Sequence, residues 1–494
     1  ILLIFSLAAP LMVLSAGTLC SAQALRSTEA PRSIHATRST QTPRLTGPLP
    51  TAATDPPARN IQRFLAKYRQ KRQDVTIVLL DGSVSTDMGY ASKRQDAAYR
   101  PPCCTEYNIP SFIEERLRWK EQQFRRYDAR RNNPDSTPVF TESQPGLTAQ
   151  YDSAWDWQNK PPVSNGYNGL TRILSGPAPQ VAYRFPKQAR RCDFIYRTDY
   201  LSSADLQVSV TTGKGSVQAY DEGSSTWKEA DGYQFSAREK DEQLPGSFFP
   251  GKPFGATSLR KSIYQKRLKM RCIIPHGDTR ISITSRDGGR LCYWGIAWSP
   301  KEYMIQFINS ARGGHDIEHL KVFEPWSLDY WKPDLILYSC NTINEGADAS
   351  PNNTTKSPEQ FAKGFETYIR SLLNKPYAPE VFAYILFTAK AHNIVNEQDV
   401  VGTTFIPGYG EASVFDFIDH LNQRLKTLPI ASVNVFYHYW ELARQKALMD
   451  HQTIYSELFS DGGPAGKTYV ADFTHLNDYG ARVGWEYLSA YFNF

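Results

Sequence analysis

Four turns in the sequence hold the side chains best suited to chemistry, and each follows an apolar run typical of a strand. The first turn is Asp81-Gly82-Ser83-Val84-Ser85, directly after the run from Asp74 to Leu80. Such a run predicts a buried parallel strand, and ligands of open α/β sheets gather at the carboxyl ends of these strands. Because Gly82 permits a tight turn, the hydroxyl of Ser83 is placed to act as a nucleophile. A turn that only links two elements is the alternative.

Two further turns offer hydrogen-bond donors. The run Tyr303–Ile308 leads into a glycine-rich turn with Gly313 and Gly314, where backbone N–H groups can donate to an anion. The run 333–338 leads into a segment with Asn344, whose side-chain amide can also donate. We expect these donors at the sheet edge that carries Ser83.

The fourth turn lies near the end of the sequence. Asp472 and His475 are three residues apart, and the amphipathic stretch 479–492 follows them. A carboxylate this close to an imidazole can orient the ring and stabilise the imidazolium that forms when it acts as a general base. With Ser83, the two residues make a candidate Ser-His-Asp triad.

Taken in order, the four turns resemble the motifs of the SGNH (GDSL-type) serine hydrolase family, in which a Ser block, a Gly block and an Asn block precede a final Asp-x-x-His block. The resemblance covers about residues 74–90 and 300–494. It implies Ser83 as nucleophile, His475 as base and Asp472 as the acid that orients the base. It further implies an oxyanion hole made by the backbone N–H of Ser83, the backbone N–H of Gly314 (with Gly313 as the alternative) and the side chain of Asn344.

Two blocks depart from the family pattern. The family's Gly-Asp-Ser reads Asp81-Gly82-Ser83 here, and its Gly-x-Asn-Asp reads Thr342-Ile343-Asn344-Glu345. The resemblance implies a carboxylic ester hydrolase that uses neither a metal nor a cofactor. The departures leave open an alternative, a catalytically inactive SGNH-fold protein with a structural or surface-assembly role.

Residues 357–459 alternate between helical and strand patterns. Helices are predicted over 357–375, 414–428 and 440–459, and strands over 380–387 and 431–439. Strands separated by helices of this length fit a parallel sheet covered on both faces. The predicted fold class is therefore α/β, with a three-layer α/β/α core like that of SGNH hydrolases and an inserted β-sandwich.

The insertion lies between the Ser block and the Gly block. Residues 110–131 have the apolar spacing of a helix, whereas residues 137–300 hold short alternating runs between turn residues, which is typical of a jelly-roll-like sandwich. Because the insertion leads directly into the Gly block, we expect it to overhang the active site. Its aromatic residues are candidates for stacking on sugar rings, or else belong to the core and rim of the sandwich: Trp155, Trp157, Tyr167, Tyr220, Trp227 and Tyr233.

The N-terminal residues have a different character. Residues 1–24 join an uncharged apolar run to small residues at Ala22 and Ala24, as in an export signal, with a membrane anchor over residues 1–19 as the alternative. Residues 25–72 are basic and rich in Pro, Thr and Ser, which predicts a flexible linker. Export would permit disulfides among the cysteines that follow residue 24, although the sequence does not indicate which of them pair.

The composition excludes several classes of protein. With 41% hydrophobic residues in 494, a wholly disordered chain is excluded, and a net charge of +6 without a dense basic stripe predicts no nucleic-acid partner. We expect a secreted or cell-surface hydrolase whose catalytic part spans 73–136 and 301–494, with the sandwich over 137–300. The expected reaction is removal of acetyl or other acyl groups from a polysaccharide or glycan.

Overall fold

The computed structural model describes the central parts of the predicted core and of the insertion. The described residues are 60–81, 109–110, 112–113, 124–126, 141–142, 148–153, 170–175, 177–184, 189–196, 198, 203–213, 215–238, 242–243, 260–261, 266–273, 279–310, 317–341, 356–386, 403–406, 410–450, 476 and 478–492. The predicted export signal lies outside them. No helix within these ranges is long and apolar enough to cross a membrane.

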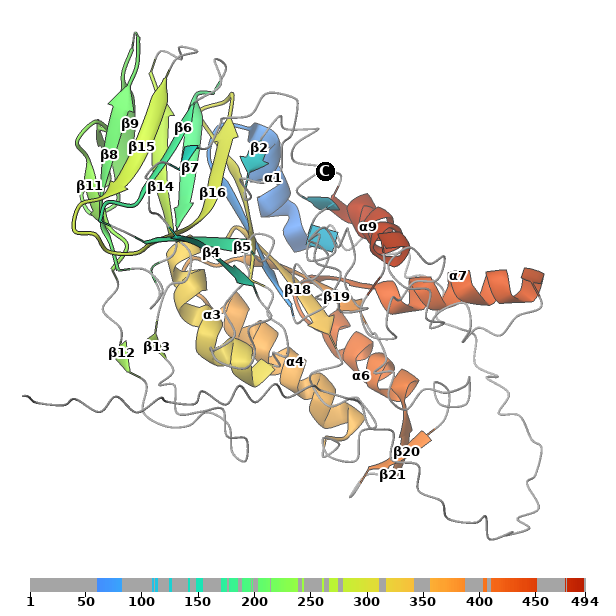
Figure 1. Cartoon of the computed structure of the whole chain (residues 1–494). Coiled ribbons are helices and arrows are strands. Elements are labelled where there is room, and N and C mark those ends of the chain that lie inside the picture. The colour runs from blue at the N-terminus through green and yellow to red at the C-terminus, as the bar shows by residue number, and fades with distance from the viewer. Residues whose placement is uncertain are drawn as a thin grey trace, which may run out of the picture. The chain divides into compact units, whose positions relative to one another are not determined.

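A parallel sheet forms the centre of the α/β part (Figure 1). Among the described residues it has five strands in the order β17-β1-β18-β19-β22, and every pairing is parallel. The strands are β1 (Val75–Leu80), β17 (Ile305–Asn309), β18 (Leu335–Asn341), β19 (Glu380–Leu386) and β22 (Ala431–Asn434). Since β17 lies on one side of β1 and all later strands lie on the other, the winding of the chain reverses at β1. Such a reversal is the topological switch point of an open α/β sheet.

Helices cover both faces of this sheet, and buried apolar runs form its strands. On one face, Tyr338 of β18 packs against Phe365 and Tyr368 of α4, with ring centroids 5.9 and 5.4 Å apart. On the other face, Phe382 of β19 packs against Tyr491 of α9 at 6.3 Å. The helices are α1 (Gln62–Gln70), α3 (Ile317–Trp331), α4 (Pro358–Leu373), α6 (Val414–Lys426), α7 (Val435–Asp450) and α9 (Asp478–Phe492). The predicted three-layer α/β/α core is confirmed.

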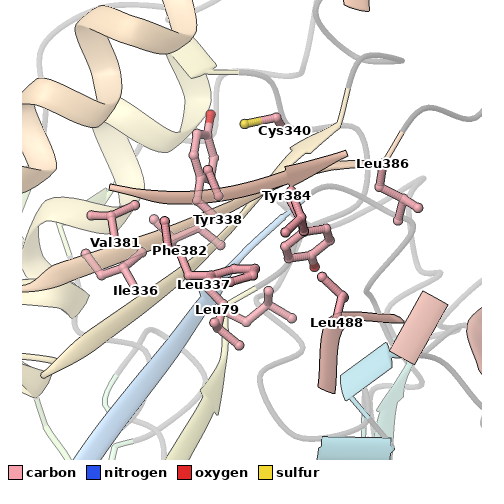
Figure 2. Packing of buried hydrophobic residues seen from close by; sticks show 14 of the residues in the cluster. Leu79, Ile336, Leu337, Tyr338, Cys340, Val381, Phe382, Tyr384, Leu386 and Leu488 are labelled. Atoms are coloured by element: carbon pink, nitrogen blue, oxygen red, sulfur yellow. The ribbon is translucent and has the colours of Figure 1, made fainter. Parts of the chain in front are cut away.

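The side chains of the sheet alternate between these two helical layers. Figure 2 shows Tyr338 and Cys340 on one side of β18, while Tyr384 of β19 and Leu488 of α9 meet on the other. Because successive side chains of a strand point to opposite faces, each strand contributes to both layers of packing.

Helix α1 lies inside the stretch for which the sequence predicts a flexible linker, residues 25–72. Its apolar face is buried in the core through Phe64, Leu65 and Tyr68. The carboxylate of Glu380, the first residue of β19, accepts the backbone N–H groups of Arg63 (3.1 Å) and Phe64 (2.6 Å). Because the N–H groups at the start of a helix lack acceptors one turn earlier, a carboxylate placed there can accept them and also complement the helix dipole.

The β-rich part contains two antiparallel sheets that share one hydrophobic core. We call them the larger and the smaller sheet. The larger sheet, as far as it is described, contains β2 (Phe124–Arg126), β4 (Thr148–Ser153), β5 (Leu170–Ser175), β7 (Arg191–Tyr196), β9 (Val217–Asp221), β10 (Thr226–Glu229), β14 (Lys266–Cys272) and β16 (Leu291–Ser299). The smaller contains β3 (Thr141–Glu142), β6 (Gln180–Arg184), β8 (Asp205–Thr211), β11 (Gln234–Ser236) and β15 (Arg280–Ser285). The α/β core is thus accompanied by a β-sandwich.

Two of the predicted elements differ in the structure. The helix predicted over 110–131 is wrong at its end, because Phe124–Arg126 form strand β2 and pair with β16. The strand predicted over 431–439 is too long, because β22 ends at Asn434 and α7 begins at Val435. The side chain of Asn434 accepts the backbone N–H of Tyr437 at 2.9 Å, which is an N-cap contact that starts the helix there.

Candidate active site

Three strands of the parallel sheet end side by side at the switch point. Leu79 of β1 is in register with Asn309, the last residue of β17, and Leu80 is in register with Tyr338 of β18. The backbone N–H of Ser310 continues this pairing, with a 2.9 Å hydrogen bond to the carbonyl of Leu79. Neighbouring strands are about 4.8 Å apart, so the chain leaves this edge three times within about 10 Å.

Buried polar residues gather at the same edge. Asp81, Asn309, Ser310 and Ser339 are each no more than 3% exposed, although they lie at or near the ends of apolar strands. The hydroxyl of Ser339 has no hydrogen-bond partner among the described residues. Since buried polar atoms are costly when unpaired, their clustering marks this edge as the polar end of an otherwise apolar sheet.

The start of helix α9 also lies at this edge. Helix α7 begins directly after the carboxyl end of β22, and Tyr439 in its first turns donates a hydrogen bond to the backbone carbonyl of Gly480 at 2.7 Å. At the other end of α9, Tyr491 packs against Phe382, near the start of β19. Helix α9 therefore runs antiparallel to the strands, with its N-terminus toward their carboxyl ends. Leu476, two residues before α9, is buried in the same core.

The site residues predicted from the sequence lie outside the described residues: Ser83, Gly313, Gly314, Asn344, Asp472 and His475. What the structure describes are the elements next to them. Ser83 is three residues beyond the end of β1, Asn344 three beyond the end of β18, and His475 immediately precedes Leu476.

Sequence reasoning did not single out Asn309, Ser310 or Ser339 as residues of this edge. The signal that could have found them is the change from apolar to polar residues at the end of each run. Their proximity to one another follows only from the strand order.

The sandwich meets the opposite edge of the parallel sheet. Asp74, just before β1, accepts the backbone N–H of Met304, just before β17, at 2.9 Å. The same carboxylate pairs with Arg191 of β7 at 3.1 Å and lies 3.6 Å from the ammonium of Lys269 on β14. These contacts are at the amino ends of the strands, so the expectation that the insertion overhangs the active site is wrong for its described part.

The ion pairs at this junction are largely buried. Arg191 also binds Asp193 at 2.7 Å, and Arg267 contacts Asp193 at 3.4 Å. Burial raises the pKa of Asp74, but the charges of Arg191, Arg267 and Lys269 hold that pKa below its ordinary value. The junction therefore keeps a carboxylate ionised while excluding most water from it.

Of the aromatic residues proposed for sugar stacking, three lie outside the described residues: Trp155, Trp157 and Tyr167. Tyr233 stacks on Phe235 at the margin of the sandwich core, which fits a structural role. Tyr220 and Trp227 lie opposite each other on β9 and β10, with ring centroids 5.2 Å apart, and both are partly exposed.

Comparisons with known proteins give only distant likenesses. No family model matches the chain, and no curated protein matches it. Among solved structures, a peptidoglycan O-acetylesterase is 11% identical, with a TM-score of 0.43, over 89% of this chain and 95% of that one.

Two other solved structures show weaker likenesses. A putative GDSL-like lipase from Parabacteroides merdae is 11% identical, with a TM-score of 0.28, over 38% of this chain and 73% of its own. A family two carbohydrate esterase from Clostridium thermocellum is 9% identical, with a TM-score of 0.24, over 69% and 97%. Scores and identities this low do not establish a common activity.

Proposed function

We propose that the chain is a secreted serine esterase of the SGNH type that removes acetyl groups from a polysaccharide or glycan. Ser83 is the nucleophile, His475 the general base and Asp472 the residue that orients it. The oxyanion hole consists of the backbone N–H groups of Ser83 and Gly314 and the side chain of Asn344.

The observation that carries this proposal is the convergence of three strand ends and one helix start at a single sheet edge. Each motif follows or precedes an element that is anchored there: β1 before Ser83, β17 before Gly314, β18 before Asn344, and α9 after His475. A reaction that needs a nucleophile, a base and two or more donors around one carbon requires such an arrangement.

The chemistry is acyl transfer in two steps. The Ser83 hydroxyl loses its proton to His475 as its oxygen attacks the ester carbonyl, and the tetrahedral oxyanion receives hydrogen bonds from the oxyanion-hole donors. Collapse of the tetrahedral intermediate expels the sugar alcohol, which takes the proton from His475 and leaves the acetyl group on Ser83. Water, activated by the same imidazole, then hydrolyses the acyl-enzyme and releases acetate.

The polysaccharide substrate and the export of the chain are further parts of the proposal. Residues 1–24 would direct export, with residues 1–19 as a membrane anchor in the alternative case. The β-sandwich provides a second surface on which a polymer can lie, away from the reacting ester. Because it offers this second surface, we propose that the inserted span 137–300 is a separate module.

The test uses a matched pair of serines from one turn. Ser83→Ala should lower kcat on p-nitrophenyl acetate by at least about 10³-fold, whereas Ser85→Ala should retain activity within a few-fold. A fluorophosphonate probe should label the wild type and S85A but not S83A. Equal activity in wild type and S83A, or no labelling of folded wild type, would overturn the esterase and favour a non-catalytic SGNH-fold scaffold.

Two more variants test the remaining roles. Asn344→Ala should lower kcat by about 10²–10³-fold, the usual effect of removing one oxyanion donor. Asp472→Asn should lower it strongly, while Asp478→Asn, in the first turn of α9, serves as the control that keeps most activity. Loss of activity in D478N but not in D472N would contradict the assignment of the orienting acid.

A further inference from the structure

One face of the larger sheet of the sandwich combines cations with aromatic rings beside the ion-pair junction, with Arg191 of the junction 5.8 Å from the ring centroid of Trp227. On β14, Lys269 and Arg271 point to the face opposite the buried Met270 and Cys272, as the alternating burial of this strand indicates. Tyr220 of β9 and Trp227 of β10 lie on the same face, beside these two cations. We call the four residues Tyr220, Trp227, Lys269 and Arg271 the cation–aromatic face.

The cations lie over the rings. The guanidinium carbon of Arg271 is 4.4 Å from the ring centroid of Trp227, and the ammonium of Lys269 is 5.0 Å from that of Tyr220. Such cation–π contacts restrict the flexible side chains of Arg271 and Lys269, and both side chains keep their positive charge. The four residues are partly exposed, so a molecule from solvent can reach them.

Among the described residues, Arg271 is the cation of this face that no carboxylate neutralises. Arg271 donates from Nε to the side-chain oxygen of Gln218 at 2.9 Å, and it forms no ion pair with a described carboxylate. Lys269 has two carboxylates nearby, Asp74 at 3.6 Å and Asp193 in register with it on β7, and Arg191 contacts both of them. The outer guanidinium N–H groups of Arg271 are thus available to a bound anion.

An acidic residue nearby does not neutralise the face. Glu229 lies on β10 in register with Gln218, one strand farther from Arg271, and it is exposed without an ion pair to a described residue. Glu222 is held by a 3.0 Å hydrogen bond from Tyr330 at the end of α3. Neither carboxylate occupies the position beside Arg271 and Lys269.

We propose that the cation–aromatic face binds a carboxylate-bearing segment of a polysaccharide, at a distance from the reacting ester. The inference rests on the proposed carbohydrate substrate, and it adds that the polymer is acidic. A uronate carboxylate accepts hydrogen bonds from Arg271 and Lys269, while the apolar side of its sugar ring packs on Trp227 and Tyr220. A simple anion would use the cations alone, whereas an acidic sugar uses the rings as well.

The test measures binding of unacetylated polygalacturonate by isothermal titration calorimetry. The wild-type chain should bind polygalacturonate and not dextran, and the affinity should fall steeply from 50 to 500 mM NaCl. The double variant Lys269→Gln with Arg271→Gln should bind at least about 10-fold more weakly, because two charge-assisted contacts are lost. Lys228→Gln is the control, since Lys228 lies next to Trp227 in sequence, points to the other face and pairs with Asp221.

A second measurement on the unmodified protein keeps the inference testable if the double variant does not fold. Free galacturonate should compete with polygalacturonate, and free galactose should not. Equal competition by the two sugars, equal affinity for dextran, tighter binding of an oligodeoxynucleotide, or unchanged binding by the folded double variant would each overturn the inference. Binding does not depend on hydrolysis, so a chain that binds polygalacturonate but fails to hydrolyse p-nitrophenyl acetate would refute only the esterase.

Discussion

The hydroxyl of Tyr439 donates a 2.7 Å hydrogen bond to the backbone carbonyl of Gly480, and this contact joins the first turns of α7 to the first turn of α9. Helix α7 is fixed in turn by β22, which it follows without a loop. Through this chain of contacts, the sheet positions the start of the helix that follows the proposed base, His475. The two helices also pack closely at this contact, because Gly484 of α9 faces the same hydroxyl of Tyr439.

Substitutions at Gly484 and Tyr439 should have non-additive effects on the free energy of unfolding. A Cβ at Gly484 would lie 2.2 Å from the Tyr439 hydroxyl oxygen, and Tyr439 is only 2% exposed, so it has little room to move. Gly484→Ala should therefore destabilise the wild type, despite the helix propensity of about 1 kcal/mol that Ala gains over Gly. In a Tyr439→Phe background, where that oxygen is gone, the same substitution should cost less.

Urea unfolding of the four chains in this cycle measures the coupling. Tyr439→Phe alone should cost about 1 kcal/mol for the lost hydrogen bond. Additive effects of the two substitutions would contradict the contact, because residues that touch are expected to couple by about 0.5–3 kcal/mol.

Gly289 should be irreplaceable in the sandwich. A Cβ there would lie 2.1 Å from the backbone carbonyl oxygen of Ser203, and backbone atoms cannot swing aside as a flexible side chain can. Gly289→Ala should lower the free energy of unfolding by at least about 2 kcal/mol. Gly213→Ala is the matched control, since no atom of another described residue, its chain neighbours aside, lies within 4 Å of its Cβ position. A comparable loss in both variants would show that the close approach is not the cause.

The carboxyl group of Asp74 should make the free energy of unfolding depend on pH in the acidic range. The lowered pKa of this carboxyl stabilises the fold above the pKa of the unfolded chain, and this contribution is lost as the pH falls through the folded pKa. Asp74→Asn should cost about 1–3 kcal/mol at pH 7, a range that allows for the 23% exposure of the side chain. The difference between the variant and the wild type should begin to shrink below about pH 4, the ordinary pKa of an aspartate, and should disappear below the lower pKa of the folded chain.

Urea unfolding between pH 3 and pH 7 checks this dependence. Asp329→Asn is the control, because Asp329 is 55% exposed and pairs with Lys375 on the surface. The control should lose less than about 1 kcal/mol. A D74N chain that keeps the full pH dependence of the wild type would show that the ionised junction is not its source.

His438 should add a second pH dependence, nearer to neutrality. Burial lowers the pKa of His438, whose ring stacks on that of Tyr487 in α9 at 4.1 Å and 8°. A histidine whose pKa is lowered by folding stabilises the fold above its unfolded value of about 6.5, and this stabilisation is lost as the pH falls. His438→Phe keeps a stacking ring without a titrating group.

Thermal unfolding between pH 5 and pH 7 should therefore separate the two chains. The wild type should lose more stability on acidification than H438F does, since the unfolded chain takes up the proton more readily than the folded chain. Parallel curves for the two chains would refute this role for His438.

Long apolar runs and amphipathic stretches made much of the core predictable. β1, β17, β18 and β19 lie where the sequence has apolar runs bounded by turn residues, and α3, α4 and α6 lie where apolar residues recur at helical spacing. The strand predicted over 431–439 is wrong beyond Asn434, because its β-branched and aromatic residues favour a strand, whereas the N-cap contact of Asn434 starts a helix there. At Phe124, pairing with β16 overrides a local helical pattern.

For the site, the sequence by itself determined which residue types follow each strand, and therefore which chemistry the turns can support. It could not determine that the ends of β17 and β18 lie on either side of β1, nor that the sandwich joins the amino edge of the sheet. Both depend on pairings and ion pairs between residues distant in sequence, such as Leu79 with Asn309 and Asp74 with Arg191. Only the tertiary structure decides these, because local patterns specify how each strand buries its faces but not which neighbour it pairs with.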